Sequence, residues 1–506
     1  MKHNKKIFWS LLIALPILMM ASGCQKYLDR KPLTATLEDL NQGGLEGQIF
    51  GLYSNLRNSA GFTSIPWLAF NDFRSDDSEK GSDPSDGAEW VAPFDKFAYV
   101  KDLWASNVYW DDHYALINLA NTAIQTADSL KLTDPSSIIN VAEARFLRAY
   151  SYFEMVRSFG EVPKIDFRIY TASQANIAKS PVSEIYKLID DDLMFAAQNL
   201  PVNWVSGADN KYPGRLTSGA AKTLQAKAYL FRASWSQTLG LCQQVIASHQ
   251  YSLFPSYYGI FKDAGENCSE SIFEIQAYVS PNGAVSNGCS YATTQGVRGS
   301  NASGWDLGWG WNTPTDSLAG AYEAGDVRRA STMLFSGQSD DPATGGYGRV
   351  LPNSTFGSPA GPLPRKYWNK KIYGDPAYRA STGQLNNPNW INKRILRYAD
   401  IVLMAAEASN ETGNGAQAAT YLNQVRARVS MPSIAYANQL QMRDVIKRER
   451  RVEFGLEGER FFDLVRWGDA TNVLGSLGYT NRCRYYPIPQ PSIDKSAGKL
   501  IQNPEW

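Results

Sequence analysis

Apolar side chains recur every three or four residues along much of this chain, which is the spacing of one face of an α-helix. Trp104, Ile117 and Ile124 belong to one such stretch. The pattern predicts helices over residues 103–130, 140–158, 182–200, 217–249, 393–411 and 415–429, with 217–249 divided into two helices. Asp134 and Pro135 supply the turn between the first two helices.

Helices joined by short turns, with small and aromatic residues alternating along them, are typical of helix–turn–helix repeats that stack side by side. We therefore predict an all-α, mostly helical fold with a tetratricopeptide-like scaffold of helix pairs. Residues 61–100, 280–315 and 335–392 interrupt the pattern and are rich in turn-forming residues and tryptophan. Long loops in a folded domain commonly carry function, so we expect the ligand site on them.

The composition is that of a globular protein without a nucleic-acid partner. Hydrophobic residues make up 43% and charged residues 20% of the 506 positions, and the net charge is +1. A nucleic-acid-binding protein needs a strong basic excess, which this chain lacks. Aromatic residues make up 12%, including 14 tryptophans, more than a core alone requires and suggestive of a binding surface rich in rings.

The N-terminus is typical of an exported protein. Lys2, Lys5 and Lys6 precede an apolar run at residues 7–21, the pattern of a secretory signal peptide. Small residues then lead to Cys24, as at a bacterial lipoprotein processing site. We predict a lipoprotein signal peptide at residues 1–23 and lipidation, including palmitate, at Cys24. An ordinary signal peptide followed by a chance cysteine remains the alternative.

Neither a metal site nor a cofactor is predicted. The chain has no CxxC, and its leader is followed by only two histidines, His113 and His249. Residues 76–87 resemble a calcium loop only weakly, because Lys80 stands at a ligand position and Gly87 replaces the final glutamate. The remaining cysteines leave one or two disulfides open, namely among Cys242, Cys268, Cys289 and Cys483.

Several longer motifs occur in a fixed order along the chain. They are EARFLRAYSYFEMVRSFGEVP at 143–163, ILRYADIVLMAAEASNETG at 395–413, RERRVEFGLEGERFFDLVRWG at 448–468 and YYPIPQPSI at 485–493. Together they resemble the SusD/RagB family of nutrient-binding outer-membrane lipoproteins. The charged motif at 448–468 has opposite charges at helical spacing, so we interpret it as a structural charge network with pairs within and between helices.

The resemblance implies a SusD-like N-terminal region at residues 24–300 with helix pairs and a RagB/SusD C-terminal region at 301–506. It implies a protein anchored to the outer membrane by its lipid and facing the cell exterior. Such proteins take part in polysaccharide utilisation: they capture an oligosaccharide or polysaccharide and deliver it to a SusC-like TonB-dependent transporter. Some members of the family bind peptides instead.

The residues themselves favour glycan capture. A flat indole covers the apolar face of a sugar ring, while carboxylates and amides bond its hydroxyl groups. The predicted ligand-binding residues are Trp67, Asn71, Asp72, Asp76, Asp77, Trp90, Trp305, Trp309 and Trp311. The last three lie in GWDLGWGWNTPT at 304–315, whose glycines predict a flexible loop. In the alternative interpretation, some of these rings pin loops to the scaffold, and Asp76 and Asp77 serve as turn or capping residues.

No sequence signature of an enzyme is present. GxSxG, HExxH, Walker and GxGxxG motifs are missing, so we predict a binding protein rather than an enzyme. A surface glycan hydrolase stays open, because its two carboxylates need not be close in sequence. Peptide binding is the other alternative. If the loop at 304–315 presents its rings to a glycan at the surface, replacing Trp305 or Trp309 with alanine should weaken glycan binding and leave the midpoint of thermal unfolding nearly unchanged.

Overall fold

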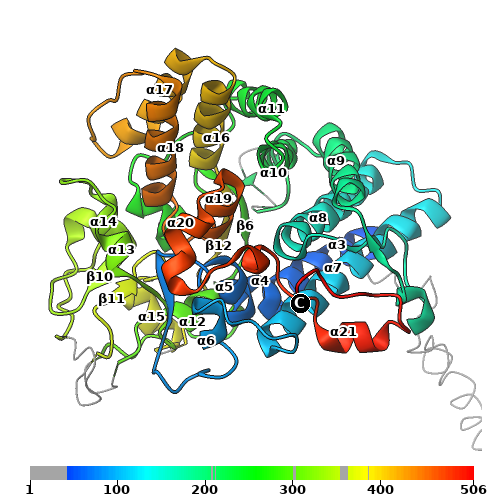
Figure 1. The fold of residues 1–506 in the computed structure, drawn as a ribbon, viewed down its shortest axis with the longest axis horizontal. Helices are drawn as coiled ribbons and strands as arrows, with labels where there is room; N and C mark the ends of the chain where they lie inside the picture. The colour runs from blue at the N-terminus through cyan, green and yellow to red at the C-terminus, as the bar shows by residue number, and fades with distance from the viewer. Residues whose placement is uncertain are drawn as a thin grey trace, which may run out of the picture. The chain divides into compact units, whose positions relative to one another are not determined.

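The computed structural model is mostly helical, with short strands in pairs (Figure 1). It describes residues 43–206, 209–210, 212, 214–299, 304–353, 363–385 and 387–506. The predicted signal peptide and Cys24 lie outside the described residues. Ile49–Trp506 forms one unit, and the stack, core and site described below lie within it.

The helices and strands have the following bounds. The helices are α3 (Gly44–Asn58), α4 (Ala60–Thr63), α5 (Ile65–Asn71), α6 (Ala92–Asp95), α7 (Trp104–Ser129), α8 (Pro135–Phe159), α9 (Val182–Asn199), α10 (Ser218–Leu230), α11 (Trp235–Ala247), α12 (Tyr291–Gln295), α13 (Asp316–Ala319), α14 (Arg328–Thr332), α15 (Pro376–Thr382), α16 (Tyr398–Glu411), α17 (Gly415–Arg428), α18 (Gln439–Glu453), α19 (Arg460–Trp467), α20 (Ala470–Leu474) and α21 (Gln490–Lys495). The antiparallel strand pairs are β1 (Ser78–Gly81) with β9 (Trp311–Pro314), β2 (Val162–Pro163) with β3 (Lys179–Ser180), β4 (Val205–Ser206) with β5 (Asp209–Asn210), β6 (Ser271–Ile275) with β12 (Lys393–Arg397), β7 (Tyr278–Val279) with β8 (Ser286–Asn287), and β10 (Met333–Phe335) with β11 (Tyr367–Asn369).

The long helices stack in sequence. Helix α7 packs against α8, α8 against α9, α9 against α10 and α10 against α11 (Figure 1). The stack continues from α11 to α16, and α16 packs against both α17 and α18. This arrangement confirms the predicted all-α scaffold of helix pairs. It also joins helices from the two predicted regions at α11 and α16, while the boundary at residues 300 and 301 stays a prediction.

Two predicted helix boundaries were wrong. Helix α8 begins at Pro135, not at residue 140, because the Asp134 side chain accepts a hydrogen bond from the Ser137 backbone N–H and Pro135 takes the first helical position. Residues 393–397 are strand β12 rather than the start of a helix, since they pair with β6. The helix there begins only at Tyr398. Apolar spacing predicts the ends of helices less well than their middles, because pairing with a distant segment can change the conformation of the terminal residues.

The charged motif at 448–468 forms a buried charge network, as predicted, with pairs within a helix, such as Arg466 with Asp463, and between elements. Glu449 and Glu453 of α18 are buried and form ion pairs with arginines of other elements rather than within the helix. These partners are Arg328 of α14, Arg397 of β12, and Arg426 and Arg428 of α17. The cluster therefore ties α18 to three other elements in the interior, where unpaired charge would be costly.

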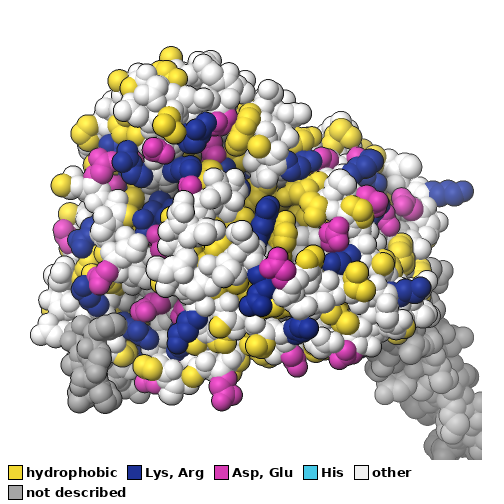
Figure 2. Space-filling model, viewed as in Figure 1, with side chains coloured by type: hydrophobic (Ala, Val, Ile, Leu, Met, Phe, Trp, Pro, Cys, Tyr) yellow, Lys and Arg dark blue, Asp and Glu magenta, His cyan; other side chains and the backbone are white. Residues whose placement is uncertain are grey.

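The structure also describes the cysteines, the apolar character of the helices and the charges on the surface. Cys242, Cys268, Cys289 and Cys483 are all free thiols in the structure. Among the helices of the described chain, none combines the length and the apolar character needed to cross a membrane. On the face shown in Figure 2, acidic and basic side chains are interspersed, which fits the net charge near zero.

Candidate functional site

The tryptophan-rich loop at 304–315 is tied to two other loop regions. Its strand β9 pairs with β1, with Gly81 opposite Trp311. Its backbone also bonds to residues 293–297: the Leu307 N–H donates to the Val297 carbonyl at 2.7 Å and the Trp309 N–H donates to the Thr293 carbonyl at 2.9 Å. The structure thus shows a loop held in place by its backbone, not the flexible loop that its glycines predict.

Close backbone packing explains the glycines. A Cβ added at Gly308 would lie 2.6 Å from the Thr293 carbonyl oxygen and 2.7 Å from Cα of Gly296. Gly310 has a φ of +74°, a region that favours glycine. Both positions let the loop lie directly on the segment after α12. The rings are therefore presented from a preorganised backbone.

Three tryptophans form an exposed aromatic surface around the loop. Trp309 is 44% exposed, Trp90 is 37% exposed and Trp104 at the start of α7 is 45% exposed. The Trp90 ring meets Trp104 edge to face with centroids 5.1 Å apart, and lies 6.0 Å from the buried Trp311 ring. We call the exposed Trp90, Trp104 and Trp309 the tryptophan surface; Trp311, predicted as a ligand-binding residue, is only 5% exposed and supports the Trp90 ring from within. Indole faces open to solvent on a rigid support are suited to stacking on a flat apolar ligand.

A pocket of about 550 Å³ adjoins Trp309 and Trp311. Its lining residues are Ile65, Asp86, Arg298, Gly299, Asp306, Gly308, Trp309, Trp311 and Asn387. Arg298 forms an ion pair with Asp86 and donates to the Ser82 hydroxyl at 2.5 Å. Asp86 and Arg298 are half-buried and paired with each other, and the half-buried Asp306 adds a carboxylate beside the rings. This is the combination that a sugar requires: an apolar platform with polar groups at its edge.

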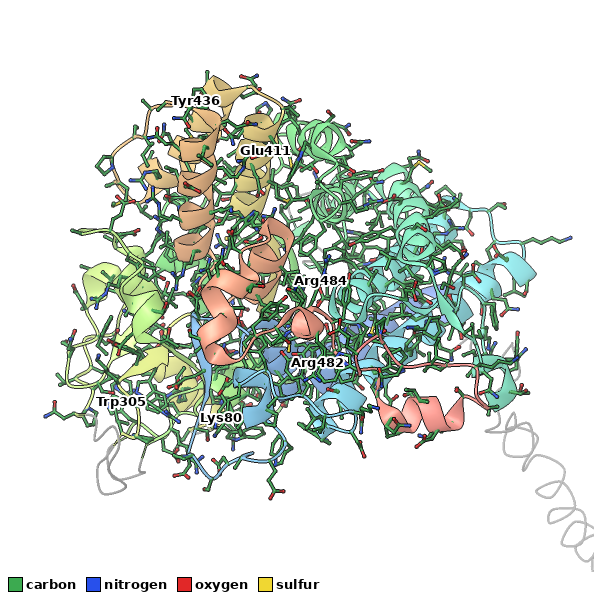
Figure 3. The ribbon with its side chains drawn as sticks, viewed as in Figure 1. Lys80, Trp305, Glu411, Tyr436, Arg482 and Arg484 are labelled. Atoms are coloured by element: carbon green, nitrogen blue, oxygen red, sulfur yellow. The ribbon has the colours of Figure 1, made fainter. Side chains whose placement is uncertain are left out.

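Lys80 organises the loop that carries Asp86. Its ammonium group donates to the carbonyl oxygens of Gly81, Asp83 and Asp86, at 3.2, 2.8 and 2.8 Å. The same ammonium lies 5.3 Å from the Trp311 ring centroid (Lys80 is labelled in Figure 3). The loop that resembles a calcium site in sequence thus wraps around a lysine side chain, which supplies the positive charge. Burial lowers the pKa of Lys80 from its ordinary value.

Trp67, Asn71 and Asp72 lie in the interior. The Lys393 ammonium lies 3.1 Å from the Trp67 ring centroid, and Asn71 accepts a hydrogen bond from Arg157. Asp72 accepts hydrogen bonds from the Gly458 N–H at 2.8 Å and from Asn312 at 2.9 Å. Burial raises the pKa of Asp72 to about 7. These side chains position the loops from within rather than facing the tryptophan surface.

Asp76 and Asp77 are held by arginines from the C-terminal part of the chain. Asp76 binds Arg460 at 2.8 Å and Arg451 at 2.8 Å. Asp77 accepts from Arg451 at 2.7 Å. A glycan hydroxyl at either carboxylate would have to compete with these ion pairs. The geometry thus favours a role for both residues in anchoring the start of β1.

Trp305 is part of a hydrophobic core. It is 3% exposed and packs with Val297, Leu307, Leu334, Leu351, Leu363, Trp368 and Tyr373. Its indole N–H donates to the Val350 carbonyl at 3.0 Å, and the Arg349 guanidinium lies 4.1 Å from the ring centroid. Figure 3 labels this residue. Its ring faces are covered by protein, so Trp305 supports the loop instead of presenting a ring to solvent.

Sequence reasoning missed several residues at this site. Trp104 follows the helical apolar spacing and was therefore assigned to the helix, yet its position at the first turn of α7 leaves it exposed. Asp86 and Asp306 lie in segments that the sequence predicts as loops, but nothing in the neighbouring sequence distinguishes them from other acidic residues there as members of the site. Arg298 and Asn387 carry no signal that periodicity or spacing can detect.

Comparisons with known proteins show which chains this one resembles. A model described as the SusD family matches residues 269–506, and one described as "Starch-binding associating with outer membrane" matches residues 67–230. SusD-like protein P2 of Formosa agariphila is 29% identical over 435 residues, which cover 81% of this chain and 82% of that protein.

Solved structures show the same fold. One named "Laminarin binding SusD-like protein" is 28% identical with a TM-score of 0.74, covering 91% of this chain and 99% of that chain. Surface glycan-binding protein A from Bacteroides fluxus is 25% identical with a TM-score of 0.74, covering 92% of this chain and 99% of that chain. The similarity extends over nearly the whole described chain.

Proposed function

Because the chain belongs to the SusD/RagB family, we propose that it is a cell-surface glycan-binding protein. It captures an oligosaccharide or polysaccharide and passes it to a SusC-like TonB-dependent transporter in the outer membrane. The observation that carries the proposal is the tryptophan surface, with exposed indoles beside a polar pocket of about 550 Å³. The name of the laminarin-binding relative supports a glycan as the ligand.

The tryptophan surface can be tested with Trp309→Ala. Since stacking buries one face of an exposed indole, its loss should weaken glycan binding about tenfold, or ~1.4 kcal/mol. The midpoint of thermal unfolding should stay nearly unchanged, because Trp309 is 44% exposed. Isothermal titration against laminarin and a panel of plant and microbial glycans measures the binding.

Tyr436→Ala is the matched control for this experiment. Tyr436 is also exposed, at 40%, but lies beside α17 and far from Trp305 (Figure 3). Its loss should leave glycan affinity unchanged. Equal effects of the two substitutions, or none from Trp309→Ala on a glycan that binds, would contradict the proposed site.

The same titration separates the alternatives. Binding without released product supports capture, since SusD-like relatives are binding proteins, whereas release of shorter sugars would identify a surface glycan hydrolase. Peptide capture would be indicated by binding of a peptide pool with no response to the glycan panel. The exposed rings favour glycan, because a peptide site relies more on backbone hydrogen bonds and charged pockets.

Attachment to the membrane is proposed through Cys24. The signal pattern at residues 1–23 and the family description "associating with outer membrane" support it. Cells fed a labelled fatty acid should incorporate it into the wild-type protein and not into Cys24→Ala. The variant should be recovered from the soluble fraction rather than from membranes, because lipidation supplies the membrane affinity. If Cys24→Ala still incorporates the labelled fatty acid, Cys24 is not the site of lipidation and this part of the proposal is wrong.

The outward orientation and the transporter partner follow from the family resemblance. A capture protein must meet polymers too large to diffuse through the outer membrane, which supports a position on the exterior. A site that binds with modest affinity is suited to handing its cargo on, because release must follow capture.

A further inference from the structure

A second pocket lies next to the tryptophan surface. It has a volume of about 460 Å³ and is lined by Gly304, Asp306, Leu307, Arg349, Pro376, Arg379 and Leu385. Asp306 also lines the pocket beside Trp309, so the two pockets adjoin. The second pocket differs from the first in the charge of its lining, which contains two arginines and one aspartate.

Arg379 of α15 is the unusual member of this pocket. It is 4% exposed, and its Nε and Nη1 atoms are buried without a hydrogen-bond partner. Within the described chain it forms no ion pair, and its guanidinium carbon lies 6.0 Å from the centroid of the Tyr373 ring. Leaving such donors unsatisfied in the interior is costly, so a buried guanidinium normally has an acceptor. Burial and the nearby Arg349 charge lower the pKa of Arg379 to about 10, which leaves it charged at neutral pH.

Arg349, the second arginine of the pocket, also contacts Tyr373. It donates to the Tyr373 hydroxyl at 3.3 Å and to the Gly304 carbonyl at 2.7 Å. None of these acceptors carries a charge. Its guanidinium is fixed over the Trp305 ring at 4.1 Å, so it is held in place before any ligand arrives. Two positive groups are thus positioned around Tyr373 without a described carboxylate in ion-pair contact.

The acids near this pocket do not neutralise it. Asp306 lines the pocket and is half-buried, and it would repel an anion placed directly against it. The Asp263 charge also acts on Arg379, but among the described residues the two form no ion pair; Oδ1 of Asp263 accepts from the Trp390 indole at 3.2 Å, and its Oδ2 is buried without a hydrogen-bond partner. Asp306 can instead accept from sugar hydroxyls where the two pockets meet. The positive end of the pocket lies at the arginines.

We propose that Arg379 and Arg349 form a subsite for an anionic substituent, a carboxylate or a sulfate, on the glycan that stacks on the tryptophan surface. The inference rests on the proposed glycan-binding function and narrows its substrate to charged polysaccharides. A planar guanidinium donates two parallel hydrogen bonds to a carboxylate or sulfate, through Nη2 together with either Nε or Nη1. Since Nε and Nη1 of Arg379 both lack a partner, either edge of its guanidinium can form such a pair. The bound anion also supplies the counter-charge that Arg379 lacks.

The test compares Arg379→Met with wild type by isothermal titration. The probes are laminarin oligosaccharides, which are neutral, oligogalacturonates, which carry carboxylates, and carrageenan oligosaccharides, which carry sulfates. Wild type should bind one anionic series at least tenfold more tightly than the neutral one. Arg379→Met should lose that preference and keep the neutral affinity, and the preference should shrink as salt is raised from 50 to 500 mM. Which anionic series responds identifies the substituent.

The same variant separates an anion site from a structural role. Because Arg379 is unpaired, its replacement by Met should leave the thermal midpoint unchanged or raise it, whereas loss of a structural ion pair would lower it. Arg379→Lys keeps the positive charge but lacks the planar guanidinium, so it should retain only part of the preference for anionic oligosaccharides. This second variant tests the proposal even if Arg379→Met does not fold. Arg482→Met, an exposed arginine against the Trp506 ring, is the control and should change nothing (Figure 3).

Two results would overturn the proposal, and they are distinct. Equal binding of neutral and anionic oligosaccharides, with no change in Arg379→Met, would leave the glycan site standing and remove the anion subsite. Absence of binding to every glycan tested, neutral and charged, would remove the proposed function and the subsite with it.

Discussion

Replacing Glu453 with alanine is expected to lower the free energy of unfolding by about 3–5 kcal/mol. Its carboxylate is fully buried and binds Arg397 at 2.6 Å, Arg428 at 2.5 Å and Arg328 at 3.0 Å. Removing it leaves guanidinium groups from three elements without this shared counter-charge. Arg328 keeps Asp326 and Glu449, and Arg397 and Arg428 keep Glu270, so the loss should be large without abolishing every pair. Denaturant-induced unfolding measures it.

Glu411→Ala is the control for this prediction. Glu411 also forms an ion pair, with Arg443 at 2.6 Å, but the Arg443 side chain is 34% exposed (Glu411 is labelled in Figure 3). Solvent screens such a pair, so its loss should cost about 1 kcal/mol or less. If Glu453→Ala and Glu411→Ala lower the free energy of unfolding by similar amounts, burial does not explain how much the Glu453 cluster stabilises the protein.

The cluster also predicts a pH dependence. Burial alone would raise the pKa of Glu453, but the guanidinium groups of Arg428, Arg397 and Arg328 outweigh it and hold the pKa well below its ordinary value. A carboxyl group whose pKa is lowered by folding stabilises the protein above its unfolded pKa of about 4.3, and this stabilisation is lost as the pH falls below that value. Wild type should therefore lose stability below about pH 4 more steeply than Glu453→Ala.

Trp305→Ala is expected to destabilise the protein by about 3–5 kcal/mol, the cost of removing a buried tryptophan. This replaces the expectation from sequence that the midpoint of thermal unfolding would hardly move. The ring is 3% exposed and packs with Leu307, Trp368 and Tyr373, so its removal leaves a cavity in that core. It also frees Arg349, whose guanidinium lies over the ring.

Trp309→Ala in the same loop is the internal comparison. Both residues are tryptophans four positions apart with glycine neighbours, yet Trp309 is 44% exposed. Unfolding curves should show a large loss for Trp305→Ala and a small one for Trp309→Ala. If the two variants lose equal stability, the assignment of Trp305 to the core and of Trp309 to the surface does not hold.

The helical scaffold could be predicted because its cause is local. Apolar spacing over stretches such as residues 103–130 and 182–200 reflects burial of one helix face, and α7 and α9 form there. The short segment at residues 393–397 could not be predicted in this way. Its conformation depends on β6, more than a hundred residues earlier, and no local pattern reports that partner.

By itself, the sequence determined the all-α scaffold of helix pairs, the family, and the location of aromatic residues on long loops, because these depend on local spacing and on ordered motifs. Only the tertiary structure decided which rings are exposed and which charges are satisfied. Trp305 and Trp309 share the same local sequence character, and Arg379 resembles any other helical arginine. Exposure and pairing depend on what distant segments place against a side chain, and that information is not contained in its neighbours along the chain.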